Sequence, residues 1–196
     1  NGSAAASTPI RTLALVGPQG AGKTSLAEAL LAKAGAIGAA GSLERGSTVS
    51  DFDPLERKMQ HSLNAAVLHL EHAGTRIHVI DTPGASDFIG QALPALEAVE
   101  TAVVVINAAS WKVSGIDAMA LRMMNYAAER RLDRLLVVNK IDAAGADLAA
   151  LLADIQATFG RECLPLNLPD AGGTKVVDCF YNREGHSDFG SVDAAH

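Results

Sequence analysis

Cysteine is scarce in this chain, which has only Cys163 and Cys179 among its 196 residues. Two cysteines cannot form a disulfide framework, and their spacing does not match that of a zinc site. We therefore do not expect a disulfide-stapled secreted domain or a cysteine-based metal site. Aromatic residues make up only 4% of the sequence, so Ala, Val, Leu and Ile must build most of the core.

Long apolar runs and a basic excess are also missing. The longest candidate run, Ala102–Ile106, has the length of a strand, far below the roughly 20 residues that span a bilayer. Residues 1–9 contain no apolar stretch of the kind found in a signal peptide. The 22 acidic residues outnumber the 16 basic ones, giving a net charge of −6, which disfavours a DNA binder that works by charge. We expect a cytoplasmic, monomeric chain with no membrane or DNA partner.

Apolar strands alternate with helical stretches along the chain, and the 48% hydrophobic content suits a folded domain. The expected strands are Thr12–Val16, Leu63–Glu71, Arg76–Asp81, Val103–Ile106, Leu135–Val138 and Val176–Tyr181, and the expected helices are Thr24–Ala34, Phe88–Glu100, Ile116–Arg131 and Ala146–Phe159. Leu63–Glu71 and Arg76–Asp81 read as a hairpin, and residues 36–62 as a long loop. This order predicts an α/β fold with a mainly parallel sheet, one antiparallel hairpin strand and helices on both faces.

A glycine-rich motif lies between the first expected strand and the first expected helix. It reads Gly17, Pro18, Gln19, Gly20, Ala21, Gly22, Lys23 and Thr24, with Ser25 following. This matches G-x-x-x-x-G-K-[ST] in the context that the phosphate loop requires. Backbone amides and the helix N-terminus would cradle phosphates, Lys23 would bridge the β- and γ-phosphates, and the Thr24 hydroxyl would bind Mg²⁺. The motif predicts a three-layer P-loop NTPase domain.

The Asp81-Thr82-Pro83-Gly84 sequence follows the second hairpin strand. A carboxylate at the carboxyl end of a strand beside a phosphate loop is placed to hold Mg²⁺ through water. The Gly84 N–H can approach a γ-phosphate because no side chain stands in the way. Taken with the phosphate loop, these residues predict a sensor of the metal and the γ-phosphate.

A third motif, Asn139-Lys140-Ile141-Asp142, follows the strand Leu135–Val138. The Asp142 carboxylate can accept two hydrogen bonds from N1–H and the exocyclic amine of guanine, a donor pair that adenine lacks. We expect the Lys140 stem to lie along the base and Asn139 to join this loop to the phosphate loop. The predicted ligands are GTP and GDP with Mg²⁺.

The three motifs, in this order, resemble the GTP-binding domain of translational GTPases, in particular elongation factor G and its elongation-factor-G-like branch. Residues 46–63 are similar to the first switch of that family, Asp81–Phe88 to its second switch, and Leu164–Pro169 with Lys175–Asp178 to the start of its insert. The resemblance implies a tail at 1–10, a GTP-binding domain at 11–162 and a truncated insert at 163–196. It also implies that Ser62 binds Mg²⁺ and that the full-length protein contacts rRNA and ribosomal proteins.

This sequence departs from the family pattern where the attacking water is positioned. Ala85 stands where the family has a histidine, and a methyl group cannot orient water. Polar Gln19 and His61 occupy two positions that are apolar in the family, Gly20 replaces an Asp or His, and Met59-Gln60 replaces an Arg-Gly pair. The family's fifth guanine-contacting element, a Ser-Ala segment, is absent.

Two accounts of catalysis remain open. In one, the protein binds GTP and hydrolyses it poorly, acting as a switch that persists in the GTP form. In the other, His61 or Gln19 takes over the positioning of water. The alternative function is a non-hydrolysing guanine-nucleotide-binding regulatory module. An ATP-using P-loop enzyme is a third, weaker alternative.

Other candidate residues lie outside these motifs. His69, His72 and His78 fall on the expected hairpin, without a partner at metal-ligand spacing in the sequence. Trp111–Ser114 lies in an expected loop where an exposed tryptophan would mark a contact site. Residues 130–134 form a basic cluster at a helix end, which suits a solvated face or a contact with rRNA.

Overall fold

The computed structural model describes residues 8–50, 56, 62–182 and 184–191 of the chain. Its contacts divide the chain into two compact units. Unit 1 comprises Asn1–Ile106 and Ala118–Val137, and unit 2 comprises Asn107–Asp117 and Val138–His196. Across the described ranges, no helix has both the length and the apolar character needed to cross a membrane.

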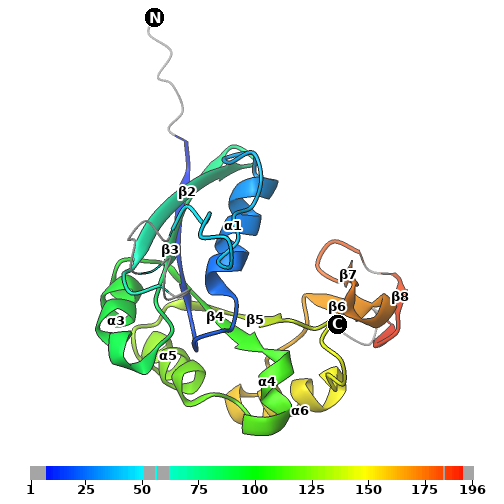
Figure 1. Ribbon diagram of the computed structural model, residues 1–196. Helices are drawn as coiled ribbons and strands as arrows, with labels where there is room; N and C mark the ends of the chain where they lie inside the picture. Colours follow the sequence, from blue (N-terminus) through cyan, green and yellow to red (C-terminus); the bar gives the residue numbers. More distant parts are fainter. Residues whose placement is uncertain (1–7, 51–55, 57–61, 183, 192–196) are drawn as a thin grey trace, which may run out of the picture. The chain divides into compact units, whose positions relative to one another are not determined.

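A five-stranded sheet with the order β2-β3-β1-β4-β5 forms the centre of the fold (Figure 1). Its strands are β1 (Ile10–Val16), β2 (Ala66–His72), β3 (Thr75–Asp81), β4 (Thr101–Asn107) and β5 (Asp133–Asn139). Strand β1 pairs in parallel with β3 and β4, whereas β2 pairs antiparallel with β3. The predicted mainly parallel sheet with one antiparallel hairpin strand is confirmed. Because β1 and β3 are parallel neighbours, Val16 and Asp81 end at the same edge.

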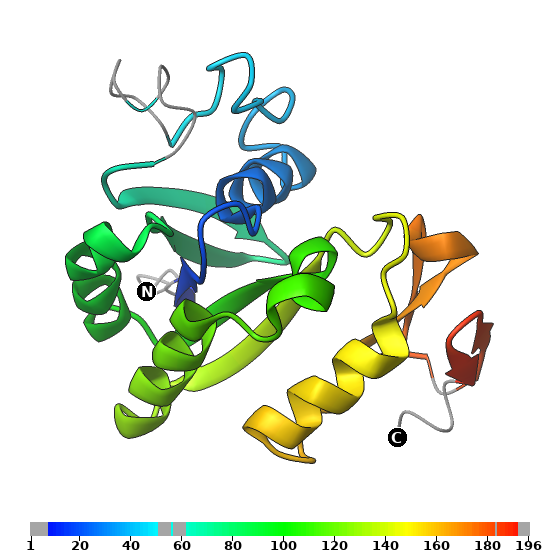
Figure 2. The same ribbon diagram turned by 60° about the horizontal axis from the view of Figure 1, so that its bottom comes forward.

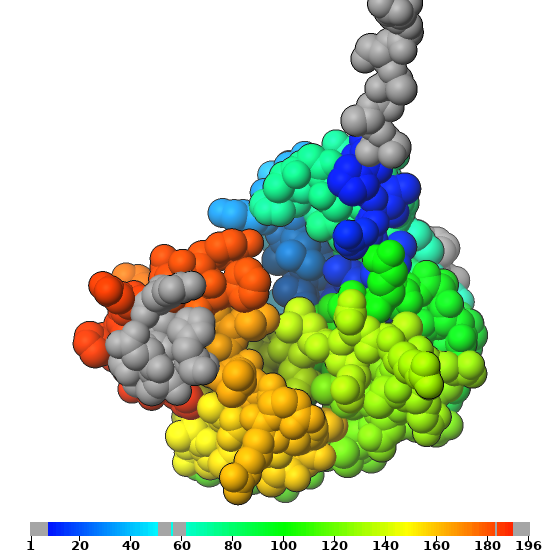
Figure 3. All heavy atoms as spheres, turned by 180° about the vertical axis from the view of Figure 1, so that it is seen from behind, coloured from blue at the N-terminus to red at the C-terminus, as the bar shows by residue number. Residues whose placement is uncertain are grey.

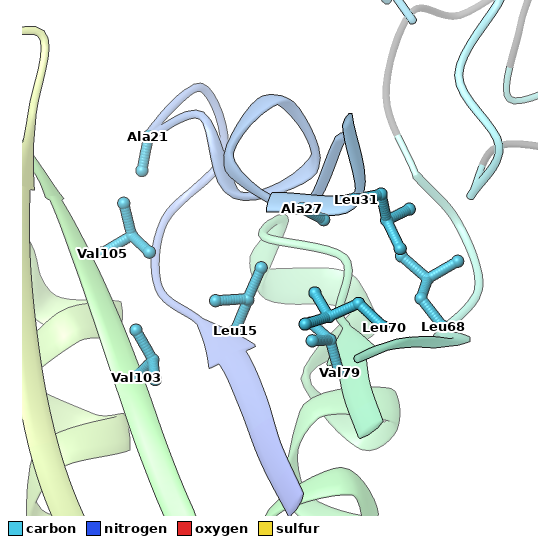
Figure 4. Packing of buried hydrophobic residues seen from close by; sticks show 9 residues of the cluster. All are labelled: Leu15, Ala21, Ala27, Leu31, Leu68, Leu70, Val79, Val103 and Val105. Atoms are coloured by element: carbon cyan, nitrogen blue, oxygen red, sulfur yellow. The ribbon is translucent and has the colours of Figure 1, made fainter. Parts of the chain in front are cut away.

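Helices cover both faces of this sheet in unit 1. Helix α1 (Lys23–Lys33) lies on one face, and α3 (Ile89–Glu97) and α5 (Ala118–Glu129) lie on the other (Figures 1 and 2). The core beneath α1 consists of buried aliphatic side chains (Figure 4), namely Leu15, Ala21, Ala27, Leu31, Leu68, Leu70, Val79, Val103 and Val105. The predicted three-layer arrangement is confirmed, with a core that contains no aromatic residue among these side chains.

The buried stripe of α1 differs from the one that the spacing of its leucines suggests. Leu26, Leu30 and Leu31 have the spacing of an apolar face, but Leu30 is 38% exposed. The helix instead buries the positions i, i+3, i+4 and i+7 of one face, occupied by Thr24, Ala27, Glu28 and Leu31. The helix is therefore turned so that Glu28 points into the interior.

The β2–β3 hairpin turns through two residues. Ala73 and Gly74 both have positive φ, 47° and 75°, which is the backbone of a type I′ turn and matches the twist of the strands. The turn pairs His72 with Thr75 and fixes the register of the hairpin. The predicted hairpin is confirmed, although β2 begins at Ala66.

The expected loop at Trp111–Ser114 is helical, so that prediction was wrong. Helix α4 (Ala108–Ser114) starts where the Asn107 side chain accepts a hydrogen bond from the Ala109 N–H, a standard N-cap contact. Trp111 is half-buried, and its Nε1–H donates to Asp154 Oδ2 at 2.6 Å. Asp154 lies on α6 (Leu148–Phe159), so the tryptophan joins two helices of unit 2.

Unit 2 also contains two small antiparallel sheets. Strands β6 (Asn167–Asp170) and β7 (Lys175–Asp178) form one, and β8 (His186–Ser187) and β9 (Gly190–Ser191) form the other. The strand predicted at Val176–Tyr181 ends at Asp178, because Asp178 Oδ1 accepts hydrogen bonds from the N–H groups of Phe180 and Tyr181. Such a turn competes with continued strand pairing.

The basic cluster at the end of α5 is partly engaged within the fold. Arg130 forms a 2.9 Å ion pair with Glu97 of α3, and the Tyr126 hydroxyl donates to the same carboxylate. The Tyr126 contact, followed by the Glu97 charge, raises the pKa of the exposed Arg130 guanidinium. Arg131 and Arg134 remain exposed.

Candidate nucleotide site

The glycine-rich loop turns tightly from β1 into α1. Gly17, Gly20 and Gly22 have positive φ values of 131°, 74° and 91°, and Gly22 directly precedes the first residue of α1. A Cβ at Gly17 would lie 2.6 Å from the Val105 carbonyl oxygen of β4. Only glycine fits there, because both the φ angle and the close approach exclude a side chain. The loop is thereby held at the carboxyl edge of β1 and β4, as the motif predicts.

Lys23 lies across the loop that it follows. Its side chain is 6% exposed, and Nζ donates to the carbonyl oxygens of Gly17 and Pro18, both at 2.9 Å. The loop residues Gln19 and Gly20 are exposed. A buried ammonium group thus stands beside an exposed turn, so an anion at that turn would gain a charge-assisted bond. Ala21 is buried and Ser25 is exposed.

Three oxygen-bearing side chains from separate segments meet beside the loop. The Thr24 hydroxyl of α1 donates to Asp81 Oδ2 of β3 at 2.7 Å, and it lies 3.3 Å from the Ser62 hydroxyl. Thr24 and Asp81 are 7% and 1% exposed. The structure therefore brings together the three residues predicted to hold a metal ion.

These donors fit Mg²⁺, which prefers hard oxygen ligands in a near-octahedral arrangement at about 2.0–2.1 Å. Neighbouring ligands of such an ion lie about 3 Å apart, and the separations from Thr24 Oγ1 to Asp81 Oδ2 and Ser62 Oγ lie on either side of that value. Asp81 supplies the negative charge. The chemistry of the donor set and its spacing are both suitable, while occupation by magnesium remains a prediction.

The segment after β3 returns to the glycine-rich loop. The buried Thr82 hydroxyl donates to the Leu15 carbonyl at 2.7 Å. At Gly84, an added Cβ would lie 2.3 Å from Lys23 Nζ and 2.6 Å from the Gln19 backbone nitrogen. This approach has no room for a side chain, and it places the Gly84 backbone beside the predicted phosphate-binding groups.

Sequence analysis missed Glu28, whose carboxylate binds the backbone of the first long loop. Glu28 is 0% exposed, and it accepts hydrogen bonds from the N–H groups of Gly41 and Val49 at 2.8 and 2.5 Å. The signal was present, because this glutamate occupies the apolar stripe of α1 with Ala27 and Leu31. A charged residue on such a stripe indicates a buried polar contact.

A second buried glutamate, also missed, holds the end of the same loop. Glu56 is 1% exposed, and its Oε1 accepts from the N–H groups of Leu63 and Asn64, both at 2.9 Å. These two residues directly follow Ser62, so Glu56 fixes the backbone next to a predicted metal ligand. Glu28 thus binds residues within this loop, and Glu56 joins the loop to the residues directly after it.

The predicted base-recognition loop belongs to unit 2. Asn139 ends β5, and its Oδ1 accepts from the Lys140 N–H at 2.9 Å. Lys140 has a positive φ of 58°, and both Lys140 and Asp142 are exposed. A Cβ at Gly173 would lie 2.5 Å from the Ile141 carbonyl oxygen, so the turn at residues 171–173 packs tightly against the loop. The Asp142 side chain is exposed to solvent, and its role in base recognition remains a prediction.

Of the residues predicted to control the attacking water, the structure describes some and not others. Ala85 is half-buried, next to Gly84, and it offers only a methyl group. His61 lies outside the described residues, as do Met59 and Gln60. Gln19 is exposed on the glycine-rich loop. No side chain is assigned to water positioning on this geometry.

Comparisons with known proteins identify the family of this chain. The family model described as "Elongation factor Tu GTP binding domain" matches residues 8–190. An elongation factor G-like protein of Mycobacterium tuberculosis is 37% identical over 177 residues, which cover 88% of this chain and 24% of that protein. Elongation factor G 2 of Streptomyces coelicolor is 36% identical over 87% of this chain and 25% of its own length. Peptide chain release factor 3 of Symbiobacterium thermophilum is 32% identical over 90% of this chain and 33% of its own length.

A solved structure supports the same relationship. The crystal structure of a Thermus thermophilus protein superimposes with a TM-score of 0.81 at 38% identity, covering 89% of this chain and 26% of that one. The chain thus spans between a quarter and a third of the length of these relatives. The resemblance seen in the sequence is confirmed: the chain belongs to the family of elongation factor Tu GTP-binding domains, alongside elongation-factor-G-like proteins.

Proposed function

We propose that this chain binds GTP and GDP together with Mg²⁺ and forms the nucleotide-binding part of a GTPase that acts in translation. The observation that carries the proposal is the meeting of Thr24, Ser62 and Asp81 beside the Lys23 ammonium group. Oxygen donors for a hard cation and a buried cationic side chain at one turn fit a nucleotide phosphate chain.

Residues of unit 1 would bind the phosphates. The Lys23 ammonium would exchange its contacts with the Gly17 and Pro18 carbonyls for phosphate oxygens, and the N-terminus of α1 adds a partial positive charge. Thr24, Ser62 and Asp81 would hold Mg²⁺, which neutralises charge on the phosphate oxygens when bound. The Gly84 N–H would donate to the γ-phosphate, which joins the second switch to the nucleotide state.

Asp142 would select the base. Its carboxylate would accept two hydrogen bonds from guanine, from N1–H and the 2-amino group. Adenine lacks these two donors, and its N1 is an acceptor that would face the carboxylate. Asn139 and Lys140 complete the loop. This assignment disfavours an ATP-using enzyme.

Ala85 determines the proposed hydrolytic behaviour. Water must attack the γ-phosphate in line, and no imidazole stands at this position to orient it. We therefore propose slow hydrolysis, with His61 as the candidate for water positioning. The same observation favours the second candidate function, a non-hydrolysing guanine-nucleotide-binding module that regulates by occupancy.

The proposed partner of the full-length protein is the ribosome, with contacts to rRNA and ribosomal proteins, in the cytoplasm. The printed names of the relatives, elongation factor G-like protein and peptide chain release factor 3, refer to translation. The mechanical output would come from ordering residues 36–62 around the γ-phosphate. The Glu28 and Glu56 contacts to that loop support this part of the proposal.

Base selection is tested by displacing a fluorescent GDP analogue from the chain in the presence of Mg²⁺. GDP and GTP should displace it, and ADP and ATP should not. The Asp142→Asn variant replaces an acceptor by a donor, which complements the 2-oxo group of xanthine. It should therefore lose affinity for GDP and gain affinity for XDP. Preferential displacement by ATP would refute the guanine assignment.

Hydrolysis is tested by phosphate release from the full-length protein, with and without ribosomes. Slow GTP turnover that increases with ribosomes, and that Ala85→His accelerates, would support the GTPase. Zero turnover in the parent under all conditions would favour the regulatory module. Equal ribosome-stimulated rates for the parent and His61→Ala would exclude His61 as the group that positions water.

A further inference from the structure

Two histidines face each other across the β2–β3 hairpin. His69 of β2 and His78 of β3 are directly paired in the antiparallel register, and their ring centroids lie 6.2 Å apart. Sequence analysis found no metal-ligand spacing for either residue, because the separation along the chain conceals a pairing that the two-residue turn creates. With His72 opposite Thr75, the register makes His69 the partner of His78.

The pair lies on the side of the hairpin opposite the α1 core. Leu68 and Leu70 point to that core, and side chains alternate along a strand, so His69 belongs to the other face. His69 is exposed and His78 is half-buried. Strand β2 is at the edge of the sheet, and Figure 3 shows the hairpin at the surface beside the first residues of β1. Both imidazoles are therefore accessible to a small ion.

The spacing of the rings suits a shared metal ion. With metal–nitrogen bonds of about 2.0–2.1 Å, two imidazoles on one tetrahedral ion have ring centroids about 5 Å apart, and a wider angle at the metal extends this to about 6.4 Å. The observed 6.2 Å lies within that limit, and the rings must approach by about 1 Å to share a tetrahedral ion. Paired backbone strands hold both ligands, which reduces the entropy lost on binding.

We propose that His69 and His78 form a two-histidine site for a zinc-type divalent transition ion, with water in the remaining positions. Imidazole prefers Zn²⁺, Ni²⁺ and Cu²⁺ to Mg²⁺ or Ca²⁺, so this site differs in chemistry from the Thr24–Asp81 site. Among the described residues, no group of three or more His, Cys, Asp or Glu side chains is placed to bind a metal. With only two protein ligands, the ion would keep water in its remaining positions.

The next charged residues on this face of the hairpin form an ion pair with each other. Glu71 and Arg76, the next residues along the two strands on this face, form a 2.9 Å ion pair with each other. Val67 and Ile80 lie on the other side of the histidines. A cation at the imidazoles thus adjoins a neutralised pair on one side and aliphatic side chains on the other.

The histidine pair lies on the same hairpin as Asp81, a predicted ligand of Mg²⁺. The Ala66–Asp81 pair lies three residue pairs from the histidines, about 10 Å along the strands. An ion shared by both strands would stabilise their pairing close to Asp81. We expect bound ion to raise the melting temperature of the chain, by mass action on the folded state.

Zn²⁺ titration of the untagged chain by calorimetry, in buffer containing excess Mg²⁺ and GDP, tests the proposal. The expected result is one saturable Zn²⁺ per chain. His69→Asn and His78→Asn should each lower the affinity by about tenfold or more, since each removes one direct ligand. The matched control, His72→Asn, changes a histidine of the same hairpin outside the pair and should bind like the parent.

Electron paramagnetic resonance with Cu²⁺ provides a second readout that does not depend on heats of binding. The parent and His72→Asn should show two nitrogen ligands, and each of the other variants only one. Circular dichroism without metal verifies that the variants are folded. The absence of saturable Zn²⁺ binding to the parent, or unchanged binding and spectra in His69→Asn and His78→Asn, would overturn the proposal.

Discussion

Replacing Glu28 by glutamine should release the first long loop from α1 without unfolding the domain. The Glu28 carboxylate has no exposed surface and accepts from two loop N–H groups, those of Gly41 and Val49. Glutamine has nearly the same shape, but it offers one oxygen acceptor and one NH₂ donor. One of the two loop amides would then face a donor, and the remaining bond would lose its charge.

The expected increase in loop opening follows from the number and type of hydrogen bonds lost. A hydrogen bond to a charged group contributes about 1.5–3 kcal/mol, and a buried donor without an acceptor costs a similar amount. Loss of one such bond corresponds to about a 10- to 150-fold increase in the opening equilibrium of the loop, at about 1.4 kcal/mol per tenfold. The loop opens as a local unit, so the free energy of global unfolding should change far less.

Amide hydrogen exchange measured by NMR tests this prediction at the residues concerned. In Glu28→Gln, the exchange rates of the Gly41 and Val49 amides should rise by the factor above, while amides of β1 and β4 keep their protection. Glu44→Gln is the matched control, because Glu44 is an exposed glutamate of the same loop. Unchanged protection of Gly41 and Val49 in Glu28→Gln would refute the reasoning.

Three further substitutions test other contacts. Gly84→Ala brings a methyl group within 2.6 Å of the Gln19 backbone nitrogen; GDP titration should show strongly weakened binding, and parent-like affinity would exclude the tight approach. Asp81→Asn removes the only formal negative charge among the predicted metal ligands, so the gain in GDP affinity from added Mg²⁺ should fall by about tenfold or more; an unchanged magnesium dependence would contradict that role. Trp111→Phe deletes the hydrogen bond to Asp154 and should lower the free energy of unfolding in urea by about 1.5–3 kcal/mol; no loss would show that the bond is unimportant for α4.

Much of unit 1 was predictable, because its signals are local. The strand before Gly17, the helix after Lys23 and the Asp81–Gly84 turn each have a sequence signature, and the parallel sheet places their ends at one edge. The hairpin was likewise indicated by two strand-like runs separated by a short segment with Gly74, although Ala73 adopts a positive φ of 47° that the sequence did not predict. Thr24 and Asp81 consequently meet as predicted, and Ser62, expected there from the family resemblance, lies beside them.

The remainder depends on tertiary contacts that a local pattern does not contain. A glutamate in a helix is ordinarily a surface residue, so Glu28 was recognisable only from the rotation of α1, and its loop partners lie 13 and 21 residues away. Helix α4 has only seven residues, too few for a clear period, and its stability comes from Trp111 and its cap. The histidine pair required the exact register of the hairpin.

The central claim is Mg²⁺-dependent selection of guanine nucleotide, and competition against a fluorescent GDP analogue tests it most directly. With Mg²⁺ present, GDP should displace the analogue at concentrations at least about a hundredfold below those required of ADP, since an unmatched buried hydrogen-bonding group costs about 1–3 kcal/mol per contact and Asp142 contacts two donors. Omission of Mg²⁺ should weaken GDP binding. Equal displacement by GDP and ADP, or binding indifferent to Mg²⁺, would contradict the proposed function.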